Sequence, residues 1–421
     1  MSRLRIDLFA PPFHGHLHPI LGLAEALRDV ASIRILTTPD ALPAISRQGF
    51  ETYPILAGTN RAVWEIVNTP GPVRGRPWML WLQFRRNLRL MPELQAEVAR
   101  AWECRRPDLA IVDFTLPLIG HWAEQRGIPW WTSHPSPLAI ETPDGTPSYL
   151  GGWKPPKSMA GRIRDAAGRR TVRLFKRALF ALYGHSLRRM GLSEIYRKNG
   201  TEAVYSDRVI LALGSRELEF PCRWPSPVRF VGPVIATPRG SEDSVLKLDP
   251  HRRNVLVTIG THLPYARSRL RREIRAWAKL SPDLFFHYSA GGQVDMEETS
   301  EGENWRFYRY INYATDLPSF DAVVHHGGAG ITYHALRAGS RAVVWPQDYD
   351  QFDFAARLEW HGLAPVCRRA AEVPSALRKV LAPEWSREPA IAFAKHLSEQ
   401  NLRVELLALL EQEGFLYHPV A

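Results

Sequence analysis

The segment from Asp321 to Gly362 constrains the fold of this chain more than any other. It begins with an apolar run typical of a buried parallel strand, and a Gly-rich turn and a helical pattern follow at once. A second apolar run and a second helical pattern complete it. A strand, a Gly-rich turn and a helix N-terminus together bind phosphate through backbone N–H groups and the helix dipole. The segment therefore predicts one half of a nucleotide-binding site.

Strands and helices also alternate on both sides of a Pro-rich segment in the middle of the chain. At 421 residues the chain is too long for one ordinary core, so we expect two doubly wound, Rossmann-like α/β domains facing each other across a ligand-binding cleft. The predicted organisation is an N-terminal domain (1–220), a linker (221–250), a C-terminal domain (251–390) and a helical tail (391–421). Apolar runs predict the strands of the first half at 5–10, 33–37, 51–55, 109–112, 130–133 and 209–213, and those of the second at 255–259, 284–288, 305–311, 322–324 and 342–345.

Two parts of the first half lack a clear strand or helix pattern. The sequence PPFHGHLH is expected to be a loop, with Pro19 at the first position of the helix that follows. Residues 59–89 read as irregular and carry Trp64, Trp78 and Trp81. Large aromatic residues on such a segment form either the core of a lid or the wall of a pocket for an apolar ligand.

Composition narrows the class of protein. No run approaches the ~20 apolar residues that span a bilayer, and Asp7 with Pro11–Pro12 interrupts the N-terminal apolar run, so we expect no signal peptide. The three cysteines are far apart and odd in number, which favours neither a disulfide framework nor a Cys-x-x-Cys metal site. These features predict a soluble, cytoplasmic enzyme.

The net charge of +11 has two possible meanings. Its arginines are dispersed rather than gathered in a nucleic-acid-binding module, so we expect no nucleic-acid partner. The one concentrated region, residues 161–189, predicts a basic amphipathic helix or helix pair. Its charged face is either simply solvated, which is the more common case, or contacts an anionic membrane surface or a lipid-like substrate.

His16 and Asp113 are the first candidates for chemistry. Each follows or ends a predicted strand, where open α/β sheets place functional groups. A neutral imidazole at position 16 could remove a proton from a hydroxyl, and a carboxylate at position 113 could fix its tautomer and stabilise the imidazolium. The alternatives are a solvent-facing loop histidine and a helix N-cap.

Two patterns raise the question of a metal. His14, His16 and His18 alternate as in hydrolases that bind a metal, but those enzymes need further ligands on one eight-fold barrel. Asp348 and Asp350 could hold a divalent cation on a diphosphate, yet the adjacent Gln351 favours recognition of hydroxyl groups. We therefore predict no metal site.

The motif HHGGAG followed by PQDYDQ, with GHLHP near the N-terminus, resembles the UDP-glycosyltransferase superfamily of GT-B fold, above all bacterial natural-product and glycolipid glycosyltransferases. The resemblance is close over 309–364, recognisable at 5–27 and 107–129, and vague elsewhere. It implies an acceptor bound by the N-terminal domain and a nucleotide sugar bound by the C-terminal domain.

The resemblance also implies a role for individual residues. His16 becomes the catalytic base and Asp113 its partner acid, while His326 binds the diphosphate. The remaining donor-binding positions are Thr261, Gly328, Gly330 and Thr332 for phosphate, Tyr310 and Ile311 for the base, and Asp350 and Gln351 for hydroxyls of the sugar.

Two positions depart from the family pattern. Ile331 stands where relatives commonly have Thr, which removes a phosphate contact or moves it to Thr332. The base-binding motif WxPQ appears as YINY, starting at Tyr310, which leaves uridine and thymidine both open.

The predicted activity is therefore inverting, metal-independent hexosyl transfer from a UDP- or dTDP-sugar to a hydroxyl, with no cofactor beyond the nucleotide sugar. A hydrophobic small molecule of polyketide, carotenoid or phenolic type, as in bacterial secondary metabolism, is favoured as acceptor over a lipid or fatty acid. A sugar-nucleotide epimerase and a non-catalytic sugar-nucleotide-binding protein are the rivals. The acceptor, sugar, regiochemistry and oligomeric state stay open. Tryptophans of the first half are expected to line the acceptor pocket: Trp64, Trp78, Trp81 and Trp131.

Overall fold

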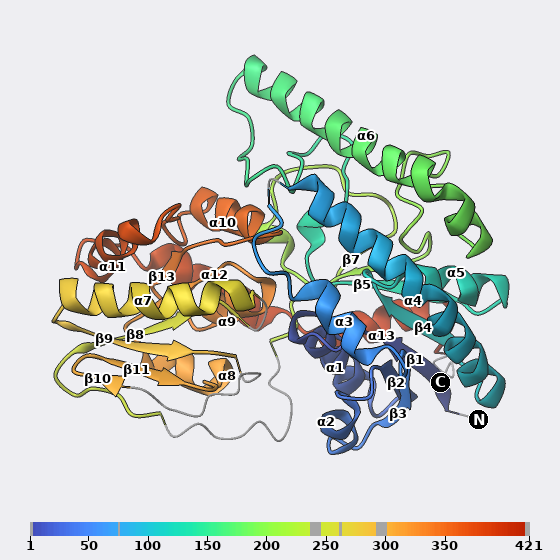
Figure 1. Ribbon diagram of the computed structural model, residues 1–421, viewed down its shortest axis with the longest axis horizontal. Helices are drawn as coiled ribbons and strands as arrows, with labels where there is room; N and C mark the ends of the chain where they lie inside the picture. The colour runs from blue at the N-terminus through green and yellow to red at the C-terminus, as the bar shows by residue number, and fades with distance from the viewer. Residues whose placement is uncertain (1–2, 75, 236–245, 261–262, 292–300, 417–421) are drawn as a thin grey trace, which may run out of the picture.

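The computed structural model describes residues 3–74, 76–235, 246–260, 263–291 and 301–416. Two parallel sheets, each covered by helices, form the two halves of the molecule (Figure 1). This architecture confirms the predicted α/β fold of two Rossmann-like domains. Among the described residues, no helix has the length and apolar character needed to cross a bilayer.

The N-terminal sheet has seven parallel strands in the order β3-β2-β1-β4-β5-β6-β7. Side chains alternate across it, so that Ile6 and Leu8 of β1 join one core while Phe9 joins the core on the opposite face. The strands are β1 (Leu4–Phe9), β2 (Ala31–Thr37), β3 (Glu51–Pro54), β4 (Leu109–Asp113), β5 (Trp130–His134), β6 (Ile210–Ala212) and β7 (Val228–Phe230). The helices are α1 (His14–Leu27), α2 (Leu42–Ser46), α3 (Asn60–Val67), α4 (Pro77–Cys104), α5 (Pro117–Gln125) and α6 (Met159–Arg189).

The C-terminal sheet has six strands in the order β10-β11-β9-β8-β12-β13, of which only the pair β10 and β11 is antiparallel. Its strands are β8 (Arg253–Thr258), β9 (Leu284–Ser289), β10 (Glu301–Gly302), β11 (Trp305–Tyr308), β12 (Ala322–His325) and β13 (Ala342–Val344). Its helices are α7 (Pro264–Leu280), α8 (Tyr313–Asp316), α9 (Ala329–Arg337), α10 (Gln351–Trp360), α11 (Val373–Leu381) and α12 (Glu388–Glu399), and α13 (Leu402–Gln412) ends the described chain.

Helix α1 begins earlier than predicted. It starts at His14, where the N–H of Leu17 already donates to the carbonyl of Phe13 at 2.8 Å, so Pro19 lies inside the helix rather than at its first position. Most of the predicted loop is thus the first turn of α1. This earlier start places His16 on a helix.

Most of residues 59–89 are helical rather than irregular. They include α3 and the first part of α4, and the described residues between these helices, 68–74 and 76, belong to no helix or strand. The buried side chains of α4 recur at Leu90, Leu94, Val98 and Ala101, on one face of the helix. Pro and Trp residues at the start of α4 obscure this period in the sequence.

The boundary between the halves also differs from the prediction. Residues 221–250, predicted as linker, contribute β7, which pairs with β6 as the last strand of the first sheet. In the tail, α12 packs against α9 of the second half, whereas α13 returns to α1 and buries Leu406, Leu409 and Leu410 in the first core. Figure 1 shows α13 among the N-terminal elements.

Candidate active site

His16 and Asp113 are brought together by neighbouring parallel strands. β1 pairs with β4, so the segments after Phe9 and at Asp113 leave the same edge of the sheet. His16 lies in the first turn of α1, and Asp113 is the last residue of β4. The Nδ1 atom of His16 lies 3.1 Å from each carboxylate oxygen of a fully buried Asp113.

The carboxylate holds the histidine in one orientation. Thr115 donates its backbone N–H to Asp113 Oδ1 at 3.0 Å, and its hydroxyl donates to the same oxygen. Burial alone would lower the pKa of His16, but the charge and hydrogen bond of Asp113, with a contribution from Asp350, raise it overall. With Nδ1 engaged, Nε2 is the ring nitrogen free to exchange a proton.

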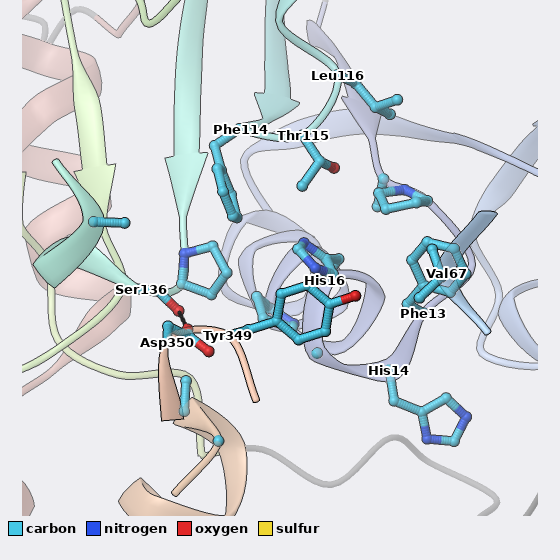
Figure 2. Close-up of a pocket in the computed structure, with 18 of the residues that line it drawn as sticks. Phe13, His14, His16, Val67, Phe114, Thr115, Leu116, Ser136, Tyr349 and Asp350 are labelled. Carbon is cyan, nitrogen blue, oxygen red and sulfur yellow. Dashed lines mark hydrogen bonds between the residues drawn. The ribbon is translucent and has the colours of Figure 1, made fainter. Parts of the chain in front are cut away.

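Aromatic rings pack around this pair. Phe114 lies 5.5 Å from the His16 ring and stacks on His134 at 4.2 Å between ring centres. Figure 2 shows the ring of His14 pointing away from His16. His14 instead stacks on His18, 4.7 Å away, and burial together with nearby His14 and His334 lowers the pKa of His18 to about 3. No group of three His, Cys, Asp or Glu side chains suited to a metal occurs among the described residues.

Across the cleft, the Gly-rich turn connects β12 to the N-terminus of α9. Gly327 has a positive φ of 84° and Gly328 is the N-cap of α9 without a capping side chain. Two glycines make room for the imidazole of His326, because a Cβ at Gly260 or at Gly328 would come within 2.8 Å or 2.4 Å of that ring. Burial lowers the pKa of His326 to about 4.

Asp350 and Gln351 begin α10 at the next strand end. The Asp350 carboxylate accepts a hydrogen bond of 2.6 Å from the hydroxyl of Ser136, which comes from the N-terminal half (Figure 2). Burial raises the pKa of Asp350, and the Ser136 bond and His16 oppose this shift. Gln351 Oε1 accepts the backbone N–H groups of Gln347 and Asp348 at 2.9 and 3.0 Å.

Both carboxylate oxygens of Asp348 accept hydrogen bonds from other groups of the protein. Its Oδ2 accepts from the backbone of Val73 at 2.6 Å and from the hydroxyl of Tyr265 at 3.3 Å. Its Oδ1 accepts from the backbone of Arg74 at 2.8 Å and of Tyr349 at 3.0 Å. Because Val73 and Arg74 belong to the first half, their bonds to Asp348 help to join the two halves.

One cavity of about 840 Å³ is lined by the predicted base His16 and by six of the nine predicted donor-binding residues. Its lining includes His16 from the first half and Tyr310, His326, Gly328, Gly330, Asp350 and Gln351 from the second. The part formed by α3, α4 and α6 is apolar, with Val63, Ile66, Phe84, Leu88, Met91, Leu179 and Phe180. Polar side chains of this region include Gln83 and Asn87 of α4 and the pair Lys176 and Glu202, and Lys176 also lies 2.7 Å from Glu141.

Several predicted donor residues lie elsewhere. Ile311 and Thr332 are fully buried and do not line the cavity, and Ile311 belongs to the hydrophobic core of the second half. Thr332 is therefore not placed to bind phosphate in place of the residue at position 331. Thr261 lies outside the described residues.

None of the four predicted acceptor tryptophans lines the cavity. Trp131 points into the core between the first sheet and α13, since alternation along β5 puts it on that face. Trp64 packs on Phe13 behind the cavity and donates its indole N–H to Asp40 at 2.7 Å. Trp78 is 60% exposed, and Trp81 lies beside Arg85. The apolar wall formed by α3, α4 and α6 consists of smaller side chains instead.

Sequence reasoning missed Ser136, Gly260 and the aliphatic wall. Ser136 follows β5 just as His16 follows β1, so its place after a strand was an available signal. The pair Lys176 and Glu202 offered no signal in the sequence, because the two residues are 26 positions apart and only the folded chain brings their side chains into contact.

Comparison with known proteins places these features in context. No family model matches the chain. It is 30% identical to 4'-demethylrebeccamycin synthase of Lentzea aerocolonigenes over 317 residues, which covers 74% of this chain and 68% of that protein. The solved structure of the glycotransferase of kitacinnamycin superposes with a TM-score of 0.71 at 19% identity, covering 98% of this chain and all of the other. The spinosyn rhamnosyltransferase SpnG superposes with a TM-score of 0.68 at 18% identity over 97% of this chain and all of its own, and it has also been solved with thymidine diphosphate and with spinosyn aglycone.

Proposed function

The chain belongs to the nucleotide-sugar-dependent glycosyltransferases of the GT-B superfamily, and from this premise we propose that it transfers a sugar, with inversion, from a UDP- or dTDP-sugar to a hydroxyl of a hydrophobic small molecule. The observation that carries the proposal is the His16–Asp113 pair, of which His16 lines the same cavity as His326 and the N-terminus of α9. The cytoplasm stays the expected location.

The proposed reaction uses His16 as general base. Nε2 of His16 takes the proton of the acceptor hydroxyl, and the oxygen of that hydroxyl attacks the anomeric carbon of the donor. The bond from that carbon to the diphosphate oxygen breaks on the opposite face, and its electron pair leaves with the nucleoside diphosphate. Asp113 stabilises the imidazolium that forms.

The second half would stabilise the leaving group. The Gly-rich turn exposes the first N–H groups of α9 to the cavity, and these groups with the helix dipole favour a diphosphate. The neutral His326 ring can add one N–H donor toward the charge that develops there. Gly328 and Gly260 leave the room that this ring occupies.

The donor sugar is assigned to Asp350 and Gln351. Asp350 faces the cavity from the start of α10 and can accept hydrogen bonds from sugar hydroxyls. Asp348 does not share this role, because backbone N–H groups and Tyr265 occupy both of its oxygens. A carboxylate satisfied in this way is a poor ligand for a cation, which supports transfer without a metal.

The shape and polarity of the cavity support an apolar acceptor. The wall formed by α3, α4 and α6 is mainly aliphatic and aromatic and lines the same cavity as His16. In the spinosyn rhamnosyltransferase the related fold holds an aglycone, and a thymidine diphosphate complex is also known. Small molecules of polyketide, carotenoid or phenolic type fit such a wall.

Mass spectrometry tests the proposal. UDP- and dTDP-sugars are each incubated with a library of hydrophobic hydroxyl compounds, with and without EDTA. We expect an acceptor that gains the mass of one glycosyl unit in either condition, and the NMR spectrum of the product should show an inverted anomeric centre. Isomerisation of the donor without acceptor, or a retained anomeric configuration, would contradict the proposal.

A further inference from the structure

Helix α6 has two faces with different environments. Its inner face contributes Lys176, Leu179, Phe180 and Leu187 to the cavity wall. Figure 1 shows α6 along the outer edge of the N-terminal half, with its other face turned away from the molecule. At 31 residues, the helix is about 45 Å long at about 1.5 Å per residue.

The outer face of α6 exposes large apolar side chains. Met159 is 66% exposed, Ile163 64% and Leu174 55%. The positions 159, 163, 170, 174 and 177 follow one another at steps of three, four or seven residues, so they lie on one side of the helix. Exposed apolar groups in a row of this length mark a contact surface rather than scattered surface residues.

The charge on that face has one sign. Arg170 and Arg177 are exposed within the apolar row, and Arg162, Arg188 and Arg189 are exposed near the two ends of the helix. The single acidic residue of α6, Asp165, is buried and pairs with Arg164 at 2.6 Å. Together, Met159, Ile163, Arg170, Leu174 and Arg177 form the outer face of α6.

We propose that the outer face of α6 docks on an anionic lipid surface. Apolar side chains of an amphipathic helix enter the boundary between headgroups and acyl chains, and cationic side chains are attracted to anionic headgroups. A second copy of the chain fits less well, because a two-fold contact would place one row of arginines against the same row. The inference goes beyond the transfer reaction and does not depend on it.

Docking would place the apolar cavity next to the bilayer. The same helix that touches lipid on its outer face forms part of the cavity wall with Leu179 and Phe180. A hydrophobic acceptor dissolved in the membrane would then reach the enzyme without crossing bulk water.

Co-sedimentation with vesicles tests this assignment. The full chain is mixed with vesicles of phosphatidylcholine, with and without phosphatidylglycerol, at low and high salt. We expect binding to the anionic vesicles that weakens as salt screens the charges. The variant Arg170→Ser/Leu174→Glu/Arg177→Ser should bind these vesicles about tenfold or more weakly, because it loses two attractive charges and gains a repulsive one.

A matched variant separates this surface from general attraction between a basic protein and lipid. Arg272→Ser/Arg378→Ser/Ile391→Glu changes the net charge equally at exposed positions of the other half, and it should bind like wild type. The proposal would be overturned if both variants lost binding to anionic vesicles to the same extent. It would also be overturned if wild type bound neutral and anionic vesicles equally well. A dimer in solution that only the α6 variant dissolves would also overturn it in favour of a second copy. Circular dichroism and the unfolding midpoint confirm that each variant is folded.

Discussion

At the scale of single residues, the site depends on an imidazole held by a buried carboxylate. Both oxygens of Asp113 lie 3.1 Å from Nδ1 of His16, so the charge of Asp113 acts directly on the proton affinity of the ring. This charge outweighs burial and leaves the pKa of His16 above its ordinary value. A general base must be neutral to accept a proton, so the acidic limb of the activity depends on this pKa.

The pH profile of kcat/KM should therefore show an acidic limb above the ordinary histidine pKa of about 6.5. Asp113→Asn removes the charge that raises the pKa, so the limb should move to lower pH while the plateau rate falls about a hundredfold or more. Initial rates over a pH series measure both changes. A limb at the same pH in wild type and variant would contradict the assigned partnership.

The sequence predicted this pair for a physical reason that does not extend to the apolar wall of the cavity. Parallel strands bring their carboxyl ends to one edge, so His16 and Asp113 could be placed together from strand positions alone. Whether a side chain on a helix or strand faces a cavity depends on packing from elsewhere. Trp131 illustrates this limit, because one step along β5 moves a side chain from one core to the other.

At the scale of elements, helix starts position the functional groups. α1 begins early enough to include His16, and α9 begins at a turn whose glycines leave room for the ring of His326. The sequence predicted the turn and helix of the second half, whereas Pro19 suggested a later start for α1. The long helix α4 was hidden because tryptophans and prolines mask the period of its buried face.

Gly328→Ala tests the tight contact at the start of α9. Its Cβ would lie 2.4 Å from Nε2 of His326 and would displace the ring. We expect the KM for the nucleotide sugar to rise about tenfold, as for loss of one charge-assisted hydrogen bond. Gly330→Ala, whose Cβ would meet nothing within 4 Å, should raise it less. Equal KM values for Gly328→Ala and wild type would rule out this role of the ring.

Helix α13 gives a second prediction at this scale. Leu410 is completely buried in the core shared with α1, although it comes much later in the sequence than the strands of that core. Leu410→Ala should lower the free energy of unfolding by about 2–5 kcal/mol. Val404→Ala, on the same helix but 57% exposed, should change it by less than about 0.5 kcal/mol. Denaturant unfolding of both variants makes the comparison, and equal midpoints would show that α13 does not stabilise the first half.

At the scale of the whole molecule, buried polar contacts join the two halves around the cavity. Asp348 holds the backbone of Val73 and Arg74, and Tyr149 donates its N–H to Asp353 at 2.9 Å. Arg357 and Glu219 form a fully buried pair at 2.7 Å between α10 and the segment after β6. Such contacts between distant parts of the chain have no local pattern, and for this reason the sequence predicted two domains and a cleft but not how they are joined.

Arg357→Met tests this connection. It leaves Glu219 buried without its cation and should destabilise the protein by about 3–5 kcal/mol. The double variant Arg357→Met/Glu219→Leu should recover most of the loss, since no unpaired charge then remains. Unfolding midpoints of the three proteins decide the matter, and a double variant as unstable as the single one would contradict the account.

The most direct test of the central claim compares wild type with His16→Ala in two measurements, sugar transfer and binding of the nucleoside diphosphate. His16 lies on the first half, whereas the proposed diphosphate contacts lie on the second. We predict that transfer falls by about three orders of magnitude or more, as expected when a general base is removed. The affinity for UDP or dTDP should stay within about threefold of wild type, because every proposed phosphate-binding group remains in place. Transfer retained at the wild-type rate, or abolished together with nucleotide binding, would contradict the assignment of His16 as the base.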